Sequence, residues 1–451
     1  MRIRIIVTIV LLLVILIFAG LIRGYTFTLP HDNGDQLFYL GLAMKLDQFG
    51  FNGYTLRNID LQGNNYLLQF LPGEVENGGL LQFLAKNGVS YYDEPLFHRS
   101  YGFPYVLMLA HRLLAHGEPY TTLITSVKDA AGRVSSLYSD KMWPLQFYAA
   151  VVPFTFSLLF IVATFFLARS FFSFKIALVS CFLIAISPID ILSAQKVWAD
   201  SMVSFFVTMT VFLFFMARDK SNLVLAFLAG IACGIGVVAK QTGGFIVIAL
   251  LLFHLWQNRT ALLKPDKIGK ILLDKYLLIF ALGLFLVSCH WFYAVAKVYG
   301  NPLYSPTQSG IEKEVGWFMM LAQRPRLIYL VSIPYLVPVF ALLYLAIAGG
   351  FFIRGFLDEK KIFLIIWYAV YLVLLIAMQG KENRYMLPAY PAIAMLSAAV
   401  LERIENFIAA RSKASYGTFF IILVLVSCAL WSVPIGIEHA RANLALILKP
   451  F

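Results

Sequence analysis

Long apolar blocks separated by shorter polar segments make up most of the chain. A helix that crosses the hydrocarbon core of a bilayer needs about 20 apolar residues at about 1.5 Å each. About eleven blocks come close to that length: 5–22, 145–168, 174–194, 199–217, 221–239, 241–257, 273–296, 327–353, 362–379, 385–402 and 416–435. The pattern predicts an all-α integral membrane protein with about eleven transmembrane helices, folded as a single domain over residues 1–451.

Two apolar runs cannot be simple straight spans. A single helix over 221–257 would be about 55 Å long, whereas the hydrocarbon core is about 30 Å thick. The segment "AKQTGG" at 239–244 is the polar break in that run, so we expect the chain to fold back there. Pro334 and Pro338 predict a kink or tilt in the run 327–353.

Two polar segments are long. Residues 23–144 form a loop between the first two predicted spans, and residues 297–326 form a second loop. A structureless loop as long as the first is uncommon in a compact protein. Apolar residues recur at helical spacing in 35–48 and 101–117, but both stretches are too short or too polar to span. We expect two helices that lie at the membrane interface with aromatic anchors.

Basic residues orient the predicted spans. With the amino terminus in the cytoplasm, every inner loop carries Lys or Arg, as cytoplasmic loops usually do. Both long loops and the carboxyl terminus then lie outside. The first block follows a basic leader like that of a signal peptide, but its apolar core is longer than usual and no small-residue cleavage motif follows. We therefore expect it to be retained as the first span.

Composition excludes several classes of protein. The chain is 60% hydrophobic and 13% charged, and its net charge of +12 comes from basic residues spread singly between apolar blocks. Nucleic-acid binding needs a clustered basic patch, so we exclude it. The four cysteines lie within apolar runs without metal-ligand spacing. No P-loop, H-E-x-x-H or C-x-x-C motif is present, and "GIACGIG" at 230–236 predicts a helix-packing face formed by Gly230 and Gly234.

Carboxylates and cations gather at the predicted outer ends of the spans. This grouping suits transfer of a group from a lipid-linked phosphate donor, because the donor's tail lies in the bilayer and no nucleotide pocket is needed. A carboxylate takes the proton of the acceptor hydroxyl, and Lys or Arg holds the leaving phosphate. The outer residues are Asp32 and Asp35; Asp93, Glu94, His98 and Arg99; Lys196 and Asp200; Lys240, Gln241 and Thr242; and Lys381, Glu382, Asn383 and Arg384.

Each of these side chains also has an ordinary structural interpretation. Asp35 is well placed to cap a helix over 36–47, and a cap would also hold a base in place. Lys240 could simply mark a loop, although an outer turn is an unusual place for Lys. Arg384 could snorkel from the start of its span, and Asp200 could cap its own span or pair with Lys196. His98 and Arg99 could close the first loop onto the membrane.

The order of these segments resembles the polytopic, inverting GT-C glycosyltransferases, especially the bacterial protein-mannosyltransferase-like and aminoarabinose-transferase-like enzymes. The resemblance covers roughly the first 400 residues. It rests on a first span, then a long outer loop that opens with an acid and a Tyr four residues later, and then on motifs in order. These motifs are "DQLFYLGLA" from Asp35, "HRSYGFPYVLMLAHRL", "WADSMVSFFVTMTVFLFF", "LAGIACGIGVVAKQTGG" and "RYMLPAYPAIAML".

The resemblance implies roles for particular residues. The catalytic base of the family is an acid in the first outer loop, which implies Asp35 here. Relatives often have Asp-Glu at this point, whereas this chain has Asp35-Gln36, so Asp32 stays open as an alternative base. The resemblance also implies that Lys240, Arg384 and Lys381 bind the donor phosphate. Substrate-binding residues by the same comparison are Tyr39, Asp200, His98 and Arg99.

We therefore expect an inverting glycosyltransferase, specific for hexosyl or pentosyl polyprenyl phosphates, in a bacterial inner membrane. Its expected partners are the lipid-linked donor, the bilayer and a glycan, lipid or protein acceptor, as in protein glycosylation or lipopolysaccharide modification. No cofactor and no metal ligand set is indicated, although the chemistry would accommodate a divalent metal. A transporter or flippase is one alternative, but it usually has paired halves and midplane charges. A lipid-pyrophosphate-dependent polysaccharide ligase or polymerase is another, but its large outer loop is expected late in the chain.

Overall fold

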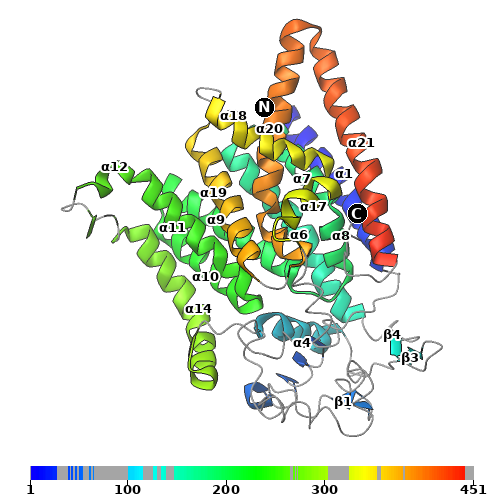
Figure 1. Ribbon diagram of the computed structural model, residues 1–451, viewed down its shortest axis with the longest axis vertical. Coiled ribbons are helices and arrows are strands. Elements are labelled where there is room, and N and C mark those ends of the chain that lie inside the picture. The colour runs from blue at the N-terminus through cyan, green and yellow to red at the C-terminus, as the bar shows by residue number, and fades with distance from the viewer. Residues whose placement is uncertain are drawn as a thin grey trace.

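The computed structural model confirms a helical membrane protein (Figure 1). The structure describes residues 2–27, 39–40, 42–43, 46–47, 50–53, 60–61, 64–65, 100–114, 125–128, 134–138, 147–264, 268–269, 271, 273–302, 325–352, 357–378 and 381–441. Asp32, Asp35, His98 and Arg99 therefore lie outside the described residues.

Six helices of the described chain are long and apolar enough to cross a membrane. They are α1 (Arg2–Phe27), α6 (Phe147–Phe171), α9 (Asp200–Asp219), α14 (Lys275–Tyr299), α19 (Glu359–Ala377) and α21 (Ala414–Arg441). A seventh span counts if the bent pair α7 (Phe174–Ala185) and α8 (Pro188–Gln195) is taken together. The predicted count of eleven is not confirmed.

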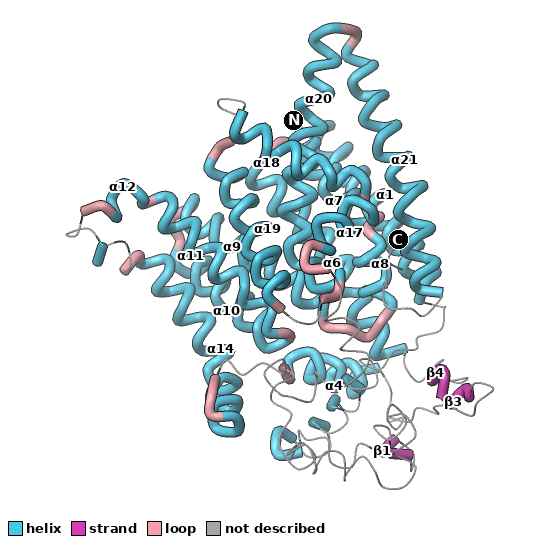
Figure 2. Tube along the Cα trace, viewed as in Figure 1, coloured by secondary structure: helices cyan, strands magenta, loops and turns pink. Residues whose placement is uncertain are grey.

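The remaining predicted spans are helical but short, interrupted or charged. They correspond to α10 (Leu223–Ala239), η3 (Gln241–Gly244) with α11 (Phe245–Gln257), α17 (Ile328–Leu336), η5 (Pro338–Ala341) with α18 (Leu342–Phe352), and η6 (Asn383–Ala389) with α20 (Tyr390–Arg411). A short α12 (Arg259–Leu262) follows α11. Figure 2 shows that short loops join most of these helices.

Both predicted interruptions are present. The run 221–257 folds back at Lys240, between α10 and η3. The run 327–353 breaks where α17 ends at Leu336 and Pro338 begins η5, whereas Pro334 lies inside α17. Proline cannot donate a backbone hydrogen bond and disfavours a helical conformation in the residue before it, so it ends a helix more readily than it continues one.

The first long loop combines helix and strand. Of the two predicted interfacial helices, 101–117 corresponds to α4 (Gly102–Leu114), and residues 39–40, 42–43 and 46–47 of the other are helical. The loop also contains a 3₁₀ turn, η1 (Gly50–Gly53), and two antiparallel hairpins, which were not predicted from the sequence. The hairpin strands are β1 (Asp60–Leu61) with β2 (Asn64–Asn65), and β3 (Thr125–Lys128) with β4 (Val134–Tyr138).

The helix α4 lies beneath one end of the bundle, and the α20–α21 turn projects from the opposite end (Figure 1). Apolar side chains of α4 pack against α6 and α10. The ring of Tyr39 meets that of Phe103 edge to face at 5.1 Å, and the Arg112 guanidinium lies 2.6 Å from the Asp47 carboxylate. These contacts hold part of the first loop against the bundle.

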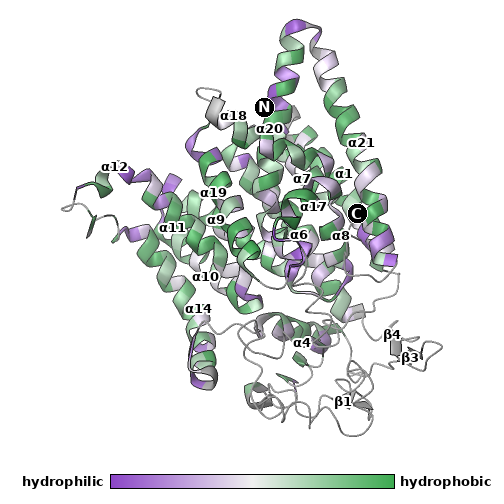
Figure 3. Cartoon of the chain, viewed as in Figure 1, coloured by the Kyte–Doolittle hydropathy of each residue, from purple (hydrophilic) through white to green (hydrophobic). Residues whose placement is uncertain are grey.

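Close helix packing confirms the predicted glycine face on α10. A β-carbon added to Gly230 would lie 2.0 Å from the Phe280 carbonyl oxygen of α14, and one added to Gly234 would lie 2.6 Å from Val287 Cβ. Hydrophobic residues dominate the bundle helices (Figure 3), and large apolar side chains such as Phe285 and Leu430 stay 62% and 73% exposed. Such outward-facing apolar surface is what a helix in contact with lipid requires.

Candidate active site

Two cations and two carboxylates from distant parts of the chain meet at the end of the bundle near α4. Asp200, the first residue of α9, accepts a hydrogen bond from Lys240 at 2.6 Å between Nζ and Oδ1. The Arg384 guanidinium lies 3.8 Å from the other oxygen of Asp200. Asp200 thus joins the turn after α10 to the segment before α20.

A second carboxylate holds Arg384 from its own segment. Arg384 Nε lies 2.6 Å from Glu382 Oε2, and Nη2 donates to Oε1 at 3.0 Å. The hydroxyl of Tyr385 donates to the same Oε1 atom at 3.1 Å. This two-point contact fixes the plane of the guanidinium. A lysine ammonium has no such plane, so a carboxylate could not orient it in the same way.

Two aromatic rings complete the cluster. The guanidinium carbon of Arg384 lies 3.9 Å from the ring centre of Trp198, and Lys240 Nζ lies 4.3 Å from that of Tyr385. Trp198 and Arg384 are 1% and 6% exposed. Cations over aromatic faces are attracted by the ring quadrupole, and the attraction strengthens when water is excluded. We refer to Trp198, Asp200, Lys240, Glu382, Arg384 and Tyr385 as the cation cluster.

Local sequence explains how Lys240 reaches the cluster. Lys240 follows α10 in an extended conformation, and its carbonyl accepts a hydrogen bond from the Gly243 N–H at 2.9 Å. A β-carbon on Gly243 would lie 2.6 Å from the Gly236 backbone, so only glycine allows η3 to pack this tightly against α10. The tight fold-back directs the Lys240 side chain toward Asp200.

Burial perturbs the lysines at this end. It lowers the pKa of Lys240, and the neighbouring Arg384 lowers it further, whereas Asp200 opposes the shift. Burial and the nearby Arg326 also lower the pKa of Lys381, which is 5% exposed. Desolvation penalises an ammonium ion, so both lysines give up their protons more readily than an exposed lysine does.

The structure brings several of the predicted site residues together. Lys240 and Arg384 both lie against Asp200, and Lys381 directly precedes Glu382. The carboxylate of Asp200 contacts Lys240 and Arg384, rather than merely capping its helix. The ring of Tyr39 packs against Phe103 of α4, and its predicted role in substrate binding stays a prediction. Asp32, Asp35, His98 and Arg99 lie outside the described residues, so their predicted roles stay predictions.

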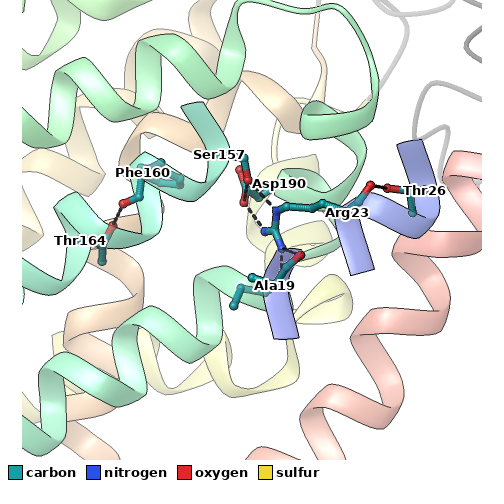
Figure 4. A network of polar contacts seen from close by, with 8 residues as sticks. Ala19, Arg23, Thr26, Ser157, Phe160, Thr164 and Asp190 are labelled. Carbon is teal, nitrogen blue, oxygen red and sulfur yellow. Dashed lines mark hydrogen bonds and ion pairs between the residues drawn. The ribbon is translucent and has the colours of Figure 1, made fainter. Parts of the chain in front are cut away.

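The sequence predicted no specific role for Trp198, Glu382 or Tyr385. Trp198 and Tyr385 lie inside quoted motifs and Glu382 is one of the outer charged residues, but nothing in the sequence identifies their partners. Arg23 and Asp190 form a buried pair that was not predicted from the sequence (Figure 4). An available signal was an acid inside the predicted span 174–194, since ionisable residues within spans are rare and usually paired. Within the described part of the chain, no three His, Cys, Asp or Glu side chains gather as metal ligands would.

Parts of the sequence match known proteins. Residues 133–304 match the family model "Dolichyl-phosphate-mannose-protein mannosyltransferase". An uncharacterised protein of Aquifex aeolicus is 27% identical over 249 residues, which cover 53% of this chain and 46% of that protein. The chain therefore spans about half the length of this curated relative.

Solved structures match nearly the whole chain. The Archaeoglobus fulgidus oligosaccharyltransferase with a tethered acceptor peptide matches with a TM-score of 0.58 and 15% identity, over 95% of this chain and 55% of that one. ArnT from Cupriavidus metallidurans bound to undecaprenyl phosphate matches with a TM-score of 0.56 and 14% identity, over 97% of this chain and 77% of that one. Both are GT-C glycosyltransferases. The matches confirm the resemblance of this chain to the GT-C glycosyltransferases, and its fold is the multi-pass membrane fold that they share.

Proposed function

We propose that this protein is a glycosyltransferase that moves a sugar from a polyprenyl-phosphate donor to an acceptor hydroxyl at the outer face of a bacterial inner membrane. The observation that carries the proposal is the cation cluster, in which Lys240 and Arg384 are held together at one end of the bundle. In support, one structural match is a complex with undecaprenyl phosphate, and an archaeal oligosaccharyltransferase matches in a complex with a dolichol-phosphate.

The cluster has the groups that a departing phosphate needs. The ammonium of Lys240 has three N–H donors, of which Asp200 accepts one, and the Lys240 side chain is 19% exposed. Arg384 presents a guanidinium whose plane Glu382 and Trp198 hold. Two cations fixed before the reaction stabilise the charge that develops on the phosphate without further reorganisation.

The proposed reaction is a single displacement. The acceptor oxygen forms a bond to the anomeric carbon of the donor while the bond from that carbon to the phosphate oxygen breaks. The acceptor proton passes to a carboxylate, for which we propose Asp35, with Asp32 as the alternative. The bonding electrons leave with the polyprenyl phosphate, whose charge Lys240 and Arg384 neutralise. Attack from the face opposite the leaving group inverts the anomeric configuration.

The proposal is tested with purified protein in lipid nanodiscs and radiolabelled hexosyl and pentosyl polyprenyl phosphates. Wild type should transfer label to an acceptor extracted from bacterial envelopes. Asp35→Asn should lose at least about 100-fold in kcat, the usual contribution of a general base. Lys240→Ala and Arg384→Ala should lose transfer, whereas Lys264→Ala, an exposed lysine beyond α12, should not. No transfer by wild type from any such donor would overturn the proposal, and full activity in Asp35→Asn would transfer the base assignment to Asp32.

A further inference from the structure

The predicted span 174–194 is broken in the structure. The helix α7 ends at Ala185, α8 begins at Pro188, and their axes differ by 56°. Pro188 has no N–H and disfavours a helical conformation in Ser187, so the break is encoded locally. A break inside the membrane leaves helix-end carbonyl groups without partners, which is costly where no water is present.

One guanidinium fills this break (Figure 4). Arg23, in the last turns of α1, donates from Nη1 to the Ala185 carbonyl oxygen at 3.0 Å. Its Nη2 atom pairs with Asp190 in the first turn of α8, and its Nε atom donates to Ser157 Oγ of α6 at 2.6 Å. Ser157 in turn donates to Asp190 Oδ2 at 2.7 Å. A single side chain thus contacts the end of α7, the start of α8 and the middle of α6.

The chemistry of this contact favours a positioning role. The side chains of Arg23 and Asp190 are both 0% exposed. Removing two charges from water is expensive, and apolar residues of similar volume often hold helices together at least as well. The ion pair also fixes an orientation, because the planar guanidinium donates hydrogen bonds only along fixed N–H directions. The positive charge also suits the carboxyl end of α7, where the helix dipole is negative.

The helix α8 leads directly into the cation cluster. It ends at Gln195, and Trp198 and Asp200 follow within the next five residues. Trp198 lies under Arg384, and Asp200 binds Lys240. The helix also contacts η6, which carries Arg384. The bend at Pro188 therefore sets the position of Trp198 and Asp200 in the cation cluster.

We propose that Arg23, Asp190 and Ser157 are positioning residues, which hold α8 at its bend and so place Trp198 and Asp200 against Lys240 and Arg384. None of the three needs to contact the donor. The kinetic part of the proposal rests on the proposed function, whereas its structural part does not, so the two are tested by separate measurements.

The structural part is tested by hydrogen–deuterium exchange of wild type and Asp190→Asn in nanodiscs. Amides of residues 196–200 should exchange at least about tenfold faster in Asp190→Asn, because α8 loses its fixed orientation. The matched control is Glu405→Gln, which breaks the Lys175–Glu405 pair between α7 and α20 at the opposite end of these helices. That variant should leave exchange at 196–200 unchanged. Unchanged exchange in Asp190→Asn, or equal acceleration in both variants, would overturn the proposal.

Ser157→Ala is a milder variant, which keeps the test valid if Asp190→Asn does not fold. It removes one hydrogen-bond partner from both Arg23 and Asp190 but leaves the charges paired, so a smaller acceleration at 196–200 is expected. In the transfer assay, Ser157→Ala and Asp190→Asn should raise the KM for the lipid donor, about threefold and tenfold, with a smaller change in kcat. A role in folding alone would lower the amount of active enzyme, and hence apparent kcat, without changing KM. If wild type transfers no sugar, the exchange result still decides the positioning role.

Discussion

The charged side chains of the cation cluster neutralise one another in pairs. Lys240 binds Asp200, and Arg384 binds Glu382 and approaches Asp200. Burying an isolated ion is costly in free energy. Each acid lowers this cost for the cation that it pairs with, so that the cation stays charged although it is largely buried. In the proposed reaction, the donor phosphate would meet cations already in position, and the acids would limit the net positive charge of the cluster.

The lowered pKa of Lys240 predicts an alkaline limit for donor binding. Burial lowers this pKa below the usual value of about 10.4. The Lys240 side chain therefore carries its positive charge well below the shifted pKa and loses that charge as the pH rises through it. The KM for the lipid donor should therefore rise on the alkaline side, before ordinary lysines titrate. Lys240→Arg, which stays protonated, should flatten this rise up to about pH 10. The exposed-site control Lys264→Arg should keep the wild-type profile. An unchanged alkaline rise in Lys240→Arg would contradict the assignment.

At the scale of elements, the pair α10 and α14 depends on glycine. The β-carbon that alanine would place at Gly230 meets the Phe280 carbonyl oxygen at 2.0 Å, so the helices would have to move apart. Small residues at such interfaces let backbones approach closely, which is how helices associate where lipid offers no hydrophobic driving force.

We expect Gly230→Ala to destabilise the protein by about 1–3 kcal/mol, the usual cost of overpacking. Thermal unfolding in detergent, followed by circular dichroism, measures the effect. Gly236→Ala is the control on the same helix, since its added β-carbon would meet only Phe206 Cβ at an ordinary 3.6 Å. It should be neutral or slightly stabilising, as expected for alanine in a helix. Equal unfolding temperatures for the two variants would rule out the packing explanation.

At the scale of the whole molecule, the two ends of the bundle differ. One end carries the cation cluster and α4, and the other carries the α20–α21 turn with Arg411 and Lys413 (Figure 1). The concentration of basic residues in the turns of the second end predicts that it faces the cytoplasm.

Cysteine labelling tests this orientation. With the four native cysteines replaced by alanine, Asn301→Cys after α14 should react with a membrane-impermeant maleimide in intact spheroplasts. Ser412→Cys, in the α20–α21 turn, should react only after the membrane is permeabilised. Labelling of Ser412→Cys in intact spheroplasts would reverse the orientation and place the cation cluster in the cytoplasm.

The sequence by itself determined where the helices lie and where several of them end. Hydropathy reports the preference of each residue for lipid or water, and proline and glycine act on their own backbone. The fold-back at Lys240, the interruption near Pro338 and the packing face of Gly230 therefore followed from local pattern. So did the grouping of Asp200, Lys240 and Arg384 at one end of the bundle, because alternate spans return the chain to the same end.

Only the tertiary structure decided which side chains meet. Asp200 pairs with Lys240, 40 residues away, rather than serving only as a cap or binding the nearby Lys196, and Arg23 pairs with Asp190 across 167 residues. Hydropathy places a residue at a depth in the membrane but gives no direction around the helix bundle. Direction comes from helix packing and from the 56° bend at Pro188, which brings Trp198 under Arg384. The pairing of charges is a property of the packed bundle, because it depends on the mutual rotation of helices that the linear pattern leaves free.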